Sequence, residues 1–400
     1  MLVKLALRNI FRNRRRSAIT LAVIVFGAVG LILFGGYKAL TFRGLRESTI
    51  RGRLGHLQLF GVGHENGSQK PLEHALENVD ALRAQIEKDP RVESTHAQIT
   101  LMGLLSNGDK SETFVATAVE PAKDRNLRGQ KVIEGTLLPD NEPDAVVLGK
   151  GLAKAMNAKV GDYLTLMTPT VTGSLNAIDV RVAGIFQTGV KELDERAVKL
   201  PIAGAQQLLQ TTKVEKLLVF LKETETTSAV RADLTKSLGK TVEMKSWSEL
   251  ASFYHQVVLL YNGIFGFLGL IVFAIVVFSV ANTIVMSIFE RTREIGTLMA
   301  IGISRSRVWR MFFLEGLMTG LLGGLLGVTA GVALGWLINR AGIMLPPPPG
   351  YTVGYPLNIL IETPILMTAF LISVITSTLS SILPALKASR LKIVDALGHI

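Results

Sequence analysis

Residues 17–40 read SAITLAVIVFGAVGLILFGGYKAL, an apolar stretch long enough to cross a hydrocarbon core of about 30 Å as one helix. Three more apolar stretches of this length follow, at 257–289, 311–338 and 357–386. A long and mostly polar segment, 41–256, separates the first stretch from the other three. The sequence therefore predicts a membrane protein with four transmembrane helices and one large domain between the first and the second.

Basic residues flank these stretches in three short segments: before the first, between the second and third, and after the fourth (Lys4, Arg8, Arg12, Arg14, Arg15 and Arg16; Arg291, Arg293, Arg305, Arg307 and Arg310; Lys387, Arg390 and Lys392). Because Lys and Arg in short flanks stay on the cytoplasmic side, both termini, including the tail 387–400, are predicted to be cytoplasmic. The domain 41–256 and the loop 339–356 are then outside. A cleaved signal peptide is the alternative, but no small-x-small pattern follows Phe34 cleanly, and the three later spans need a cytoplasmic start.

The formal net charge is +11, and the chain has no cysteine. Much of the basic excess lies in the cytoplasmic flanks, where membrane topology accounts for it, so no nucleic-acid partner is predicted. Without cysteine the outer domain must fold around its own core, and thiolate zinc sites and thiol nucleophiles are excluded. The 6 histidines show no metal-ligand spacing. We expect no catalytic, metal or cofactor-binding residues in this chain.

One stretch, Gly239-Lys240-Thr241, looks like the end of a phosphate-binding loop. That loop needs a second glycine five residues before Gly239, so that backbone amides can wrap a phosphate, and Leu234 stands there. Gly239 is better placed to end a helix predicted over 228–238. The sequence therefore predicts no ATPase site at this position.

The domain 41–256 alternates between strand and helix patterns. Its two halves contain predicted strands at His56–Phe60, Lys216–Leu221 and Val242–Lys245, helices at 79–86 and Ser228–Leu238, and a hairpin of Val92–Leu105 and Glu112–Val119 around Asn107-Gly108. The middle section, 132–200, has a short helix at Gly151–Met156 and strands at Tyr163–Thr168 and Ile178–Phe186. We expect an α+β domain with a split core and an inserted β subdomain over 132–200.

Both ends of this domain are predicted to continue as helices into the membrane. No proline occurs before Pro71, so the first helix can run past Leu40 toward Arg51, and the stretch from Trp247 to Arg293 is also free of proline. Neither end has the Gly/Ser/Pro composition of a flexible tether, which is the alternative.

Glycines recur at fourfold spacing in the third span, in two sets: Gly320 and Gly324, and Gly323, Gly327, Gly331 and Gly335. Residues four apart share a helix face, and a face without Cβ atoms lets another helix approach closely. We predict close helix packing along one face. Ionisable residues inside the spans are few, so no charged route through the bilayer is predicted.

The N-terminal residues 1–16 mix apolar side chains with arginines. This composition predicts an interfacial amphipathic helix on the inner leaflet, with its basic side chains against membrane lipids. A charged flank that only sets the topology is the alternative.

The cytoplasmic loop 290–310 reads ERTREIGTLMAIGISRSRVWR. Its charges alternate with Ile295, Leu298, Met299 and Ile301, which predicts a short amphipathic helix between two spans. The pattern R-x-R-E-I-G-x-L-x-A-x-G-x-S, and the F-x-x-E-G that ends at Gly316, resemble the MacB/FtsX-like ABC transporter permeases.

The resemblance extends along the whole chain. The phrases VVLGKGLA (146–153), VGDYLTL (160–166) and VAGIFQTG (182–189) look like the periplasmic domain of that family, and PALKASRLKIVDAL (384–397) is similar to its C-terminal signature. The chain resembles the LolC/LolE-type lipoprotein-releasing permeases more than it resembles MacB, and GHLQ (55–58) looks like the opening strand of their periplasmic domain.

For this family the loop implies a coupling helix that docks on a cytoplasmic ABC ATPase subunit, which binds ATP and Mg²⁺. The coupling residues predicted here are Arg291, Arg293, Glu294, Ile295, Gly296, Ala300, Gly302 and Ser304. The resemblance also implies a dimer with a second permease copy or a paralogue, and the heterodimers of LolC/LolE leave that choice open. MacB carries a fused ATPase domain before its first span and this chain does not, so we expect the ATPase in a separate subunit and no enzyme activity here.

We therefore expect a permease subunit of the bacterial inner (plasma) membrane that transmits cytoplasmic ATP hydrolysis to a periplasmic domain. Its cargo would be a lipoprotein, a lipid or an amphiphile, with a further periplasmic partner as an option. One alternative is an FtsX-like regulator of a periplasmic cell-wall hydrolase, which would bind that hydrolase on 41–256. The other is a membrane-bound enzyme, against which the lack of a catalytic constellation counts.

Overall fold

The computed structural model describes residues 14–64, 72, 74–124, 131–239, 241–347, 350 and 352–390. The chain divides into two compact units, with boundaries at 43/44, 256/257, 345/346 and 355/356. The part with the apolar helices is called the membrane unit, and the remainder is called the outer unit. The predicted interfacial helix over 1–16 and the tail 387–400 lie largely outside the described residues.

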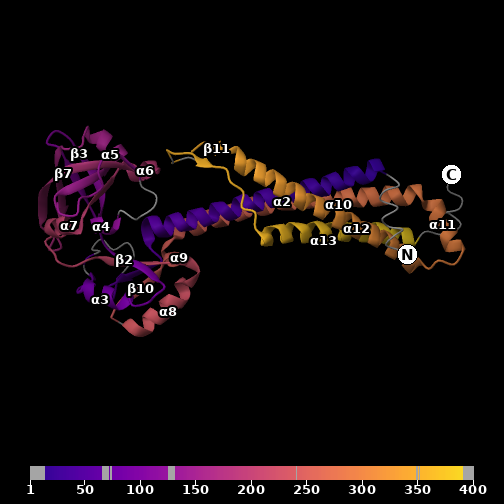
Figure 1. The fold of residues 1–400 in the computed structure, drawn as a ribbon, viewed down its shortest axis with the longest axis horizontal. Coiled ribbons are helices and arrows are strands. Elements are labelled where there is room, and N and C mark those ends of the chain that lie inside the picture. Colours follow the sequence, from indigo (N-terminus) through magenta and orange to yellow (C-terminus); the bar gives the residue numbers. More distant parts are fainter. Residues whose placement is uncertain are drawn as a thin grey trace. The chain divides into compact units, whose positions relative to one another are not determined.

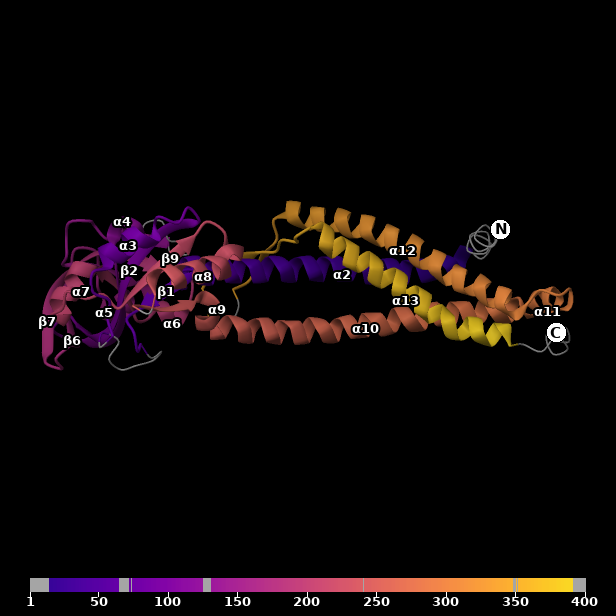
Figure 2. The ribbon, with the colours of Figure 1, turned by 90° about the horizontal axis from the view of Figure 1, so that it is seen from below.

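Among the residues that the structure describes, four helices are long and apolar enough to cross a bilayer: α2 (Arg14–Thr49), α10 (Ser252–Glu290), α12 (Arg305–Ala341) and α13 (Thr363–Ser389). They run side by side in both ribbon views (Figures 1 and 2). A short helix, α11 (Thr292–Ala300), joins α10 to α12. The predicted architecture of four membrane helices, with one large domain between the first and the second along the chain, is confirmed.

Apolar side chains from all four long helices meet in one buried cluster, which includes Ile24 of α2, Val276 and Ile284 of α10, Phe312 of α12 and Ala385 of α13. Lipid tails are as apolar as these side chains, so burial from lipid provides little driving force for their association. The shape of the packed surfaces therefore decides how the helices associate.

The fourth membrane helix begins later than predicted, because residues 357–362 are not helical and α13 starts at Thr363. A helix from 357 would place Pro364 in its interior, where proline removes a hydrogen bond and clashes with the preceding turn. Instead, the Ile359 N–H donates to Asn339 Oδ1 (2.7 Å), and the Ile359 carbonyl accepts from Asn339 Nδ2 (2.9 Å). The prediction of a helix over 357–386 is wrong at its N-terminal end.

The outer unit is built on a ten-stranded sheet with the order β10-β1-β9-β2-β3-β8-β5-β7-β4, and β6 pairs with both β2 and β7. The strands are β1 (Leu57–Phe60), β2 (Val92–Ser106), β3 (Ser111–Val119), β4 (Lys131–Gly135), β5 (Ala145–Gly149), β6 (Tyr163–Pro169), β7 (Leu175–Gln187), β8 (Ala197–Pro201), β9 (Lys216–Leu221) and β10 (Glu243–Ser246). The antiparallel pairing of β2 with β3 confirms the hairpin at Asn107-Gly108, and Gly108 has the positive φ (+92°) that this turn requires.

Short helices complete the outer unit: α3 (Val79–Ile86), α4 (Pro121–Asp124), α5 (Lys150–Met156), α6 (Lys191–Asp194), α7 (Ile202–Leu209), the 3₁₀ turn η2 (Thr224–Thr226), α8 (Thr227–Leu238) and α9 (Trp247–Leu250). Gly239 follows α8 with φ +63°, and its N–H donates to the Thr235 carbonyl. Gly239 is therefore the helix C-cap that the sequence indicates. The two-residue strands β11 (Met344–Leu345) and β12 (Tyr355–Pro356) flank the loop between α12 and α13.

Strands β4 to β8 come from the inserted section, and they continue the sheet that the two flanking halves begin. Strand β8 pairs with β3 in parallel, and one buried core includes Leu148 and Val180 from the insertion as well as Leu57 and Val219 from the flanking halves. Because β6 pairs with both β2 and β7, the strands β2, β3, β8, β5, β7 and β6 close into a ring, and β9, β1 and β10 extend from β2 outside it.

The two ends of the outer unit leave it as helices, but in different ways. Helix α2 continues into a π-helical turn, η1 (Ile50–Leu54), just before β1. Helix α9 is separated from α10 by Ala251, which leaves the helical region (φ −89°, ψ 53°), so the prediction of an unbroken helix from Trp247 is wrong there. His255 favours the break, because its Nε2–H donates to the Ser248 carbonyl (2.9 Å), which a continuous helix would use for its own ladder.

Candidate functional site

The loop between α10 and α12 folds as its pattern predicts, with a short helix between two turns. Arg291 leaves the helical region (φ −115°, ψ 12°), and α11 (Thr292–Ala300) follows it. Gly302 has φ +96°, which glycine adopts without steric cost, and extended Ser304 precedes α12. Residues 305–310 of the predicted loop form the first turns of α12.

The inner face of α11 is part of the membrane unit. Ile295 is buried in the same cluster as Phe312 and Ala385, and Gly296 beside it is also buried. These two predicted coupling residues therefore position the helix by packing inward.

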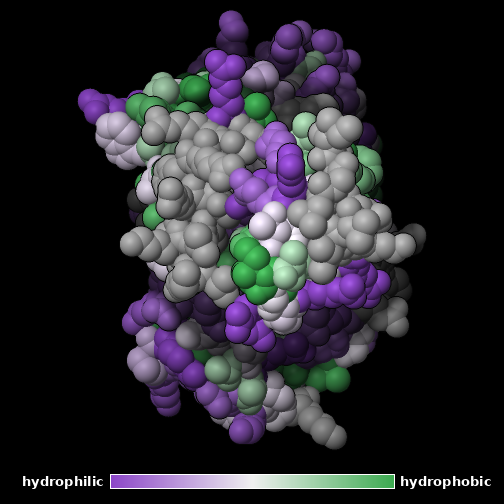
Figure 3. Space-filling view, turned by 90° about the vertical axis from the view of Figure 1, so that its right-hand side faces the viewer, coloured by the Kyte–Doolittle hydropathy of each residue, from purple (hydrophilic) through white to green (hydrophobic). Residues whose placement is uncertain are grey.

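The remaining predicted residues are exposed: Arg293, Glu294 and Ala300 on the outer face of α11, and Gly302 and Ser304 in the turn between α11 and α12. Partly buried Arg291 holds Glu294 in place, with its Nε 3.1 Å from Glu294 Oε2. Ile301 is 77% exposed, because it follows the last helical residue instead of continuing the apolar stripe. Figure 3 views this end of the molecule and shows hydrophobic residues next to hydrophilic ones.

The glycines of α12 lie on two faces of the helix and contact two different neighbours, which corrects the prediction of one face. A Cβ built on Gly320 would lie 2.9 Å from Ser377 Cβ of α13, and one on Gly324 would lie 3.1 Å from the Phe370 ring. The second row faces α2, where Cβ atoms on Gly323, Gly327 and Gly331 would meet Ile24, Ala28 and Ile32, respectively. Gly335 continues this row toward Ile359 and Ile361. Helix α12 is therefore held closely on both sides.

The contact between α12 and α13 also contains hydroxyl groups that the sequence analysis missed. Ser377 is fully buried, and its Oγ donates to the Gly316 carbonyl of α12 at 2.8 Å. Gly316 extends the glycine row by one turn, since a Cβ there would overlap Ser381. A signal was available, because Ser373, Ser377 and Ser381 are spaced four apart in the sequence.

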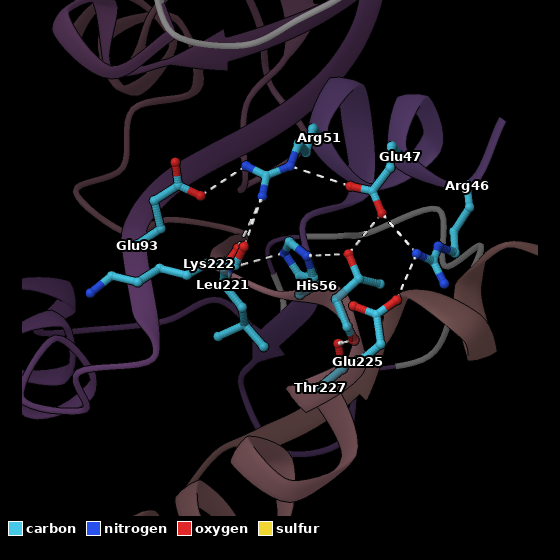
Figure 4. Close-up of polar contacts among 10 residues, drawn as sticks. Arg46, Glu47, Arg51, His56, Glu93, Leu221, Lys222, Glu225 and Thr227 are labelled. Atoms are coloured by element: carbon cyan, nitrogen blue, oxygen red, sulfur yellow. Dashed lines mark hydrogen bonds and ion pairs between the residues drawn. The ribbon is translucent and has the colours of Figure 1, made fainter. Parts of the chain in front are cut away.

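Within the outer unit, the end of α2 and the turn η1 are joined to the sheet by a group of polar side chains that we call the stalk joint: Glu47, Arg51, His56, Glu93 and Thr224. Figure 4 shows these contacts. Arg51 Nη1 donates to Glu93 Oε2 of β2 (2.8 Å), and its Nε lies 3.4 Å from Glu47 Oε2. The same guanidinium donates to the Leu221 carbonyl at the end of β9 (3.2 Å). Arg51 thus links the helix to two strands.

His56 lies at the centre of the stalk joint and is fully buried. Its Nδ1 accepts the Leu221 N–H (3.0 Å), so the ring proton is on Nε2, which donates to Thr224 Oγ1 (3.1 Å). Thr224 in turn donates to Glu47 Oε1 (2.9 Å). Burial, and next the charge of Arg51, lower the pKa of His56 to about 4, so the ring is neutral at neutral pH. Within the described ranges, no group of three or more His, Asp or Glu side chains could hold a metal ion.

Two known families match different parts of the chain. Residues 17–237 match the MacB-like periplasmic core domain, over more than half of the chain. Residues 266–393, with α11, α12 and α13, match the C-terminal domain of FtsX-like permeases.

Named relatives agree with this assignment. The lipoprotein-releasing system transmembrane protein LolC of Neisseria meningitidis is 25% identical over 60% of this chain, and the match spans 61% of the length of that relative. LolC of Xylella fastidiosa is 24% identical over 78% of this chain and 79% of its own. Among solved structures, the periplasmic region of MacB from Actinobacillus actinomycetemcomitans covers 52% of this chain and 95% of its own, with 16% identity and a TM-score of 0.38. The chain belongs to the MacB/FtsX/LolC-type family of ABC transporter permeases, multi-pass proteins of the inner membrane.

Proposed function

We propose that this chain is the membrane subunit that couples ATP hydrolysis, in a separate cytoplasmic ABC ATPase subunit, to movement of its own outer unit. That movement extracts or exports a lipoprotein, a lipid or another amphiphile already present at the outer face of the membrane. The ATPase subunit binds ATP and Mg²⁺, and the permease acts as a dimer with a second copy or a paralogue. The names of the LolC relatives support lipoprotein release over regulation of a cell-wall hydrolase.

The observation that carries this proposal is the way α2 enters the outer unit. The helix has no break from Arg14 to Thr49, and the stalk joint then fixes its end to β1, β2 and β9. A rigid helix carries displacement along its axis, so movement at its membrane end reaches the sheet. The exposed face of α11, with Glu294 and Ile301, supplies the surface through which the ATPase subunit would act.

The orientation follows from the basic flanks, with both termini in the cytoplasm. It is tested by placing single cysteines at Ser174 and Ser304, both exposed, in this cysteine-free chain. An impermeant thiol reagent added to intact cells should label Ser174→Cys and spare Ser304→Cys. The reverse result would overturn the orientation.

The function is tested by purifying the chain in mild detergent and reconstituting it in proteoliposomes. An ABC ATPase subunit should co-purify, and Mg-ATP should release a fluorescent diacylated lipopeptide from the vesicles. Purification without the ATPase subunit provides the control, which should neither hydrolyse ATP nor release the lipopeptide. A complex that hydrolyses ATP in the presence of the lipopeptide and yet releases none would refute the proposed cargo class.

A further inference from the structure

The loop that joins α12 to α13 is hydrogen-bonded to the end of β7 within the outer unit. The Lys191 N–H donates to the Gly350 carbonyl (2.9 Å), and the Thr352 N–H donates to the Gly189 carbonyl (2.8 Å). Gln187 Nε2 also donates to Thr352 Oγ1 (2.6 Å). These five residues are called the loop clasp.

The strand side of the loop clasp is a braced turn. Gly189 has φ +87°, a conformation that side chains rarely adopt, so the turn between β7 and α6 is specified by its sequence. Buried Asp194 holds the same turn, because its Oδ1 accepts from the Thr188 N–H (2.8 Å) and from Thr188 Oγ1 (2.7 Å). These hydrogen bonds fix the conformation of the turn to which Gly350 and Thr352 are bonded.

The loop clasp and the two helices that leave the outer unit, α2 and α9, attach to different strands of the sheet. Helix α2 is fixed by the stalk joint next to β1 and β9, and α9 follows β10 directly. These three strands lie beyond β2, whereas β7 belongs to the closed ring of β2, β3, β8, β5, β7 and β6. Forces that arrive at two separate strands can twist or shear the sheet, which a single point of attachment cannot do.

We propose that the loop clasp is a third drive element, which delivers movement of α12 and α13 to β7 while α2 and α10 act on the strands beyond β2. The inference rests on the proposed function, and it adds Gln187, Gly189 and Thr352 as positioning residues. The loop clasp stays closed throughout the cycle, and the sheet deforms between the closed ring and the strands beyond β2.

The test slackens the loop without removing its hydrogen bonds. Three glycines are inserted between Pro346 and Pro347, and three more between Val353 and Gly354. The matched control carries six glycines at Gly173, in the hairpin tip between β6 and β7, where a Cβ meets no atom of the described residues within 4 Å. Spin labels on cysteines at exposed Lys131 of β4 and Lys236 of α8 report the distance across the sheet in the complex with the ATPase subunit.

Mg-ATP with vanadate should shift this distance in the unmodified chain and in the control, and the shift should be lost in the slackened variant. An equal shift in the slackened variant, or no shift in the unmodified chain, overturns the inference. A disulfide between Gln187→Cys and Thr352→Cys tests the closed state. The cross-linked chain should release the lipopeptide at the normal rate, and a loss of release that reductant restores would show that the clasp must open.

Failure of this inference can be distinguished from failure of the proposed function. Glycines inserted after Phe253 of α10 interrupt a stalk helix and leave the loop clasp intact. If this insertion stops lipopeptide release and the slackened loop does not, the third drive element is wrong and the coupling function stands. If neither insertion affects release, the coupling function itself is refuted.

Discussion

Acidification should open the stalk joint through His56. Burial, followed by the charge of Arg51, lowers its pKa to about 4 in the folded state, whereas an unfolded histidine titrates near 6.5. Below about pH 6.5 the opened segment binds a proton at His56 that the folded segment does not. The contribution of His56 to the stability of the closed stalk joint is therefore complete above this pH and is lost as the pH falls toward 4. Between pH 7.5 and 5 the free energy of opening falls by about 2 kcal/mol. Because about 1.4 kcal/mol corresponds to a factor of ten, the opening equilibrium constant rises roughly 30-fold.

Hydrogen exchange at the Leu221 amide, which donates to His56 Nδ1, measures this opening in the full chain. The protection factor is corrected for the intrinsic exchange rate at each pH. It should fall roughly 30-fold between pH 7.5 and 5, which corresponds to a loss of about 2 kcal/mol in the free energy of opening. His56→Gln keeps an acceptor but does not titrate, so most of the fall should disappear. His96 is the matched comparison, because burial lowers its pKa to about 4 as well. In His96→Gln, the part of the fall in the protection factor that comes from His56 should remain. An equal fall in His56→Gln and the unmodified chain would refute the reasoning.

Three further predictions concern the membrane unit and its stalks. Glu294→Lys should reduce co-purification of the ATPase subunit by about tenfold or more if the charge is desolvated at the interface. Glu112→Lys, at an exposed position of β3 in the outer unit, is the control and should co-purify normally. Unchanged co-purification of Glu294→Lys contradicts the docking surface. Gly327→Leu should lower the free energy of unfolding by about 2 kcal/mol, because a Cβ at this position overlaps Ala28. The control is Gly263→Leu, which should leave the melting temperature unchanged because a Cβ there meets no atom of the described residues within 4 Å. Four glycines after Phe253 should preserve assembly and ATP hydrolysis but stop lipopeptide release, and release at the normal rate would argue against a mechanical stalk.

Local patterns predicted the elements of this protein well. The hairpin at Asn107-Gly108, the helix at Ser228–Leu238 and the short helix between two spans all follow from contacts within a few residues. Pro364 also carried a local signal that marks the start of α13, but the apolar run from Leu357 concealed it, because hydropathy does not distinguish an extended apolar segment from a helix.

The stalk joint could not be predicted in this way. Glu47, His56, Glu93 and Thr224 come from segments far apart in the chain, and the order of the strands brings them together. The Glu47/Arg51 spacing predicts a pair on one helix face, but no pattern indicates that the guanidinium would reach two strands. The loop clasp depends in the same way on a pairing between residues near 189 and residues near 352.

The two glycine rows of α12 also bear on how hybrid permeases can be assembled. Each row fits the surface of one neighbouring helix. An α12 taken from a relative will therefore pack correctly only if α2 and α13 are taken from the same relative. A single-residue deletion inside α12 would rotate every later glycine by about 100° away from its neighbour. The part of α10 around Gly263, Gly266 and Gly269 is under no such restriction, since these glycines face open space in the described structure, whereas Val276 and Ile284 pack in the shared cluster. Chimeras should therefore tolerate exchange of residues 263–269 of α10, whereas α2, α12 and α13 should be inherited as a set.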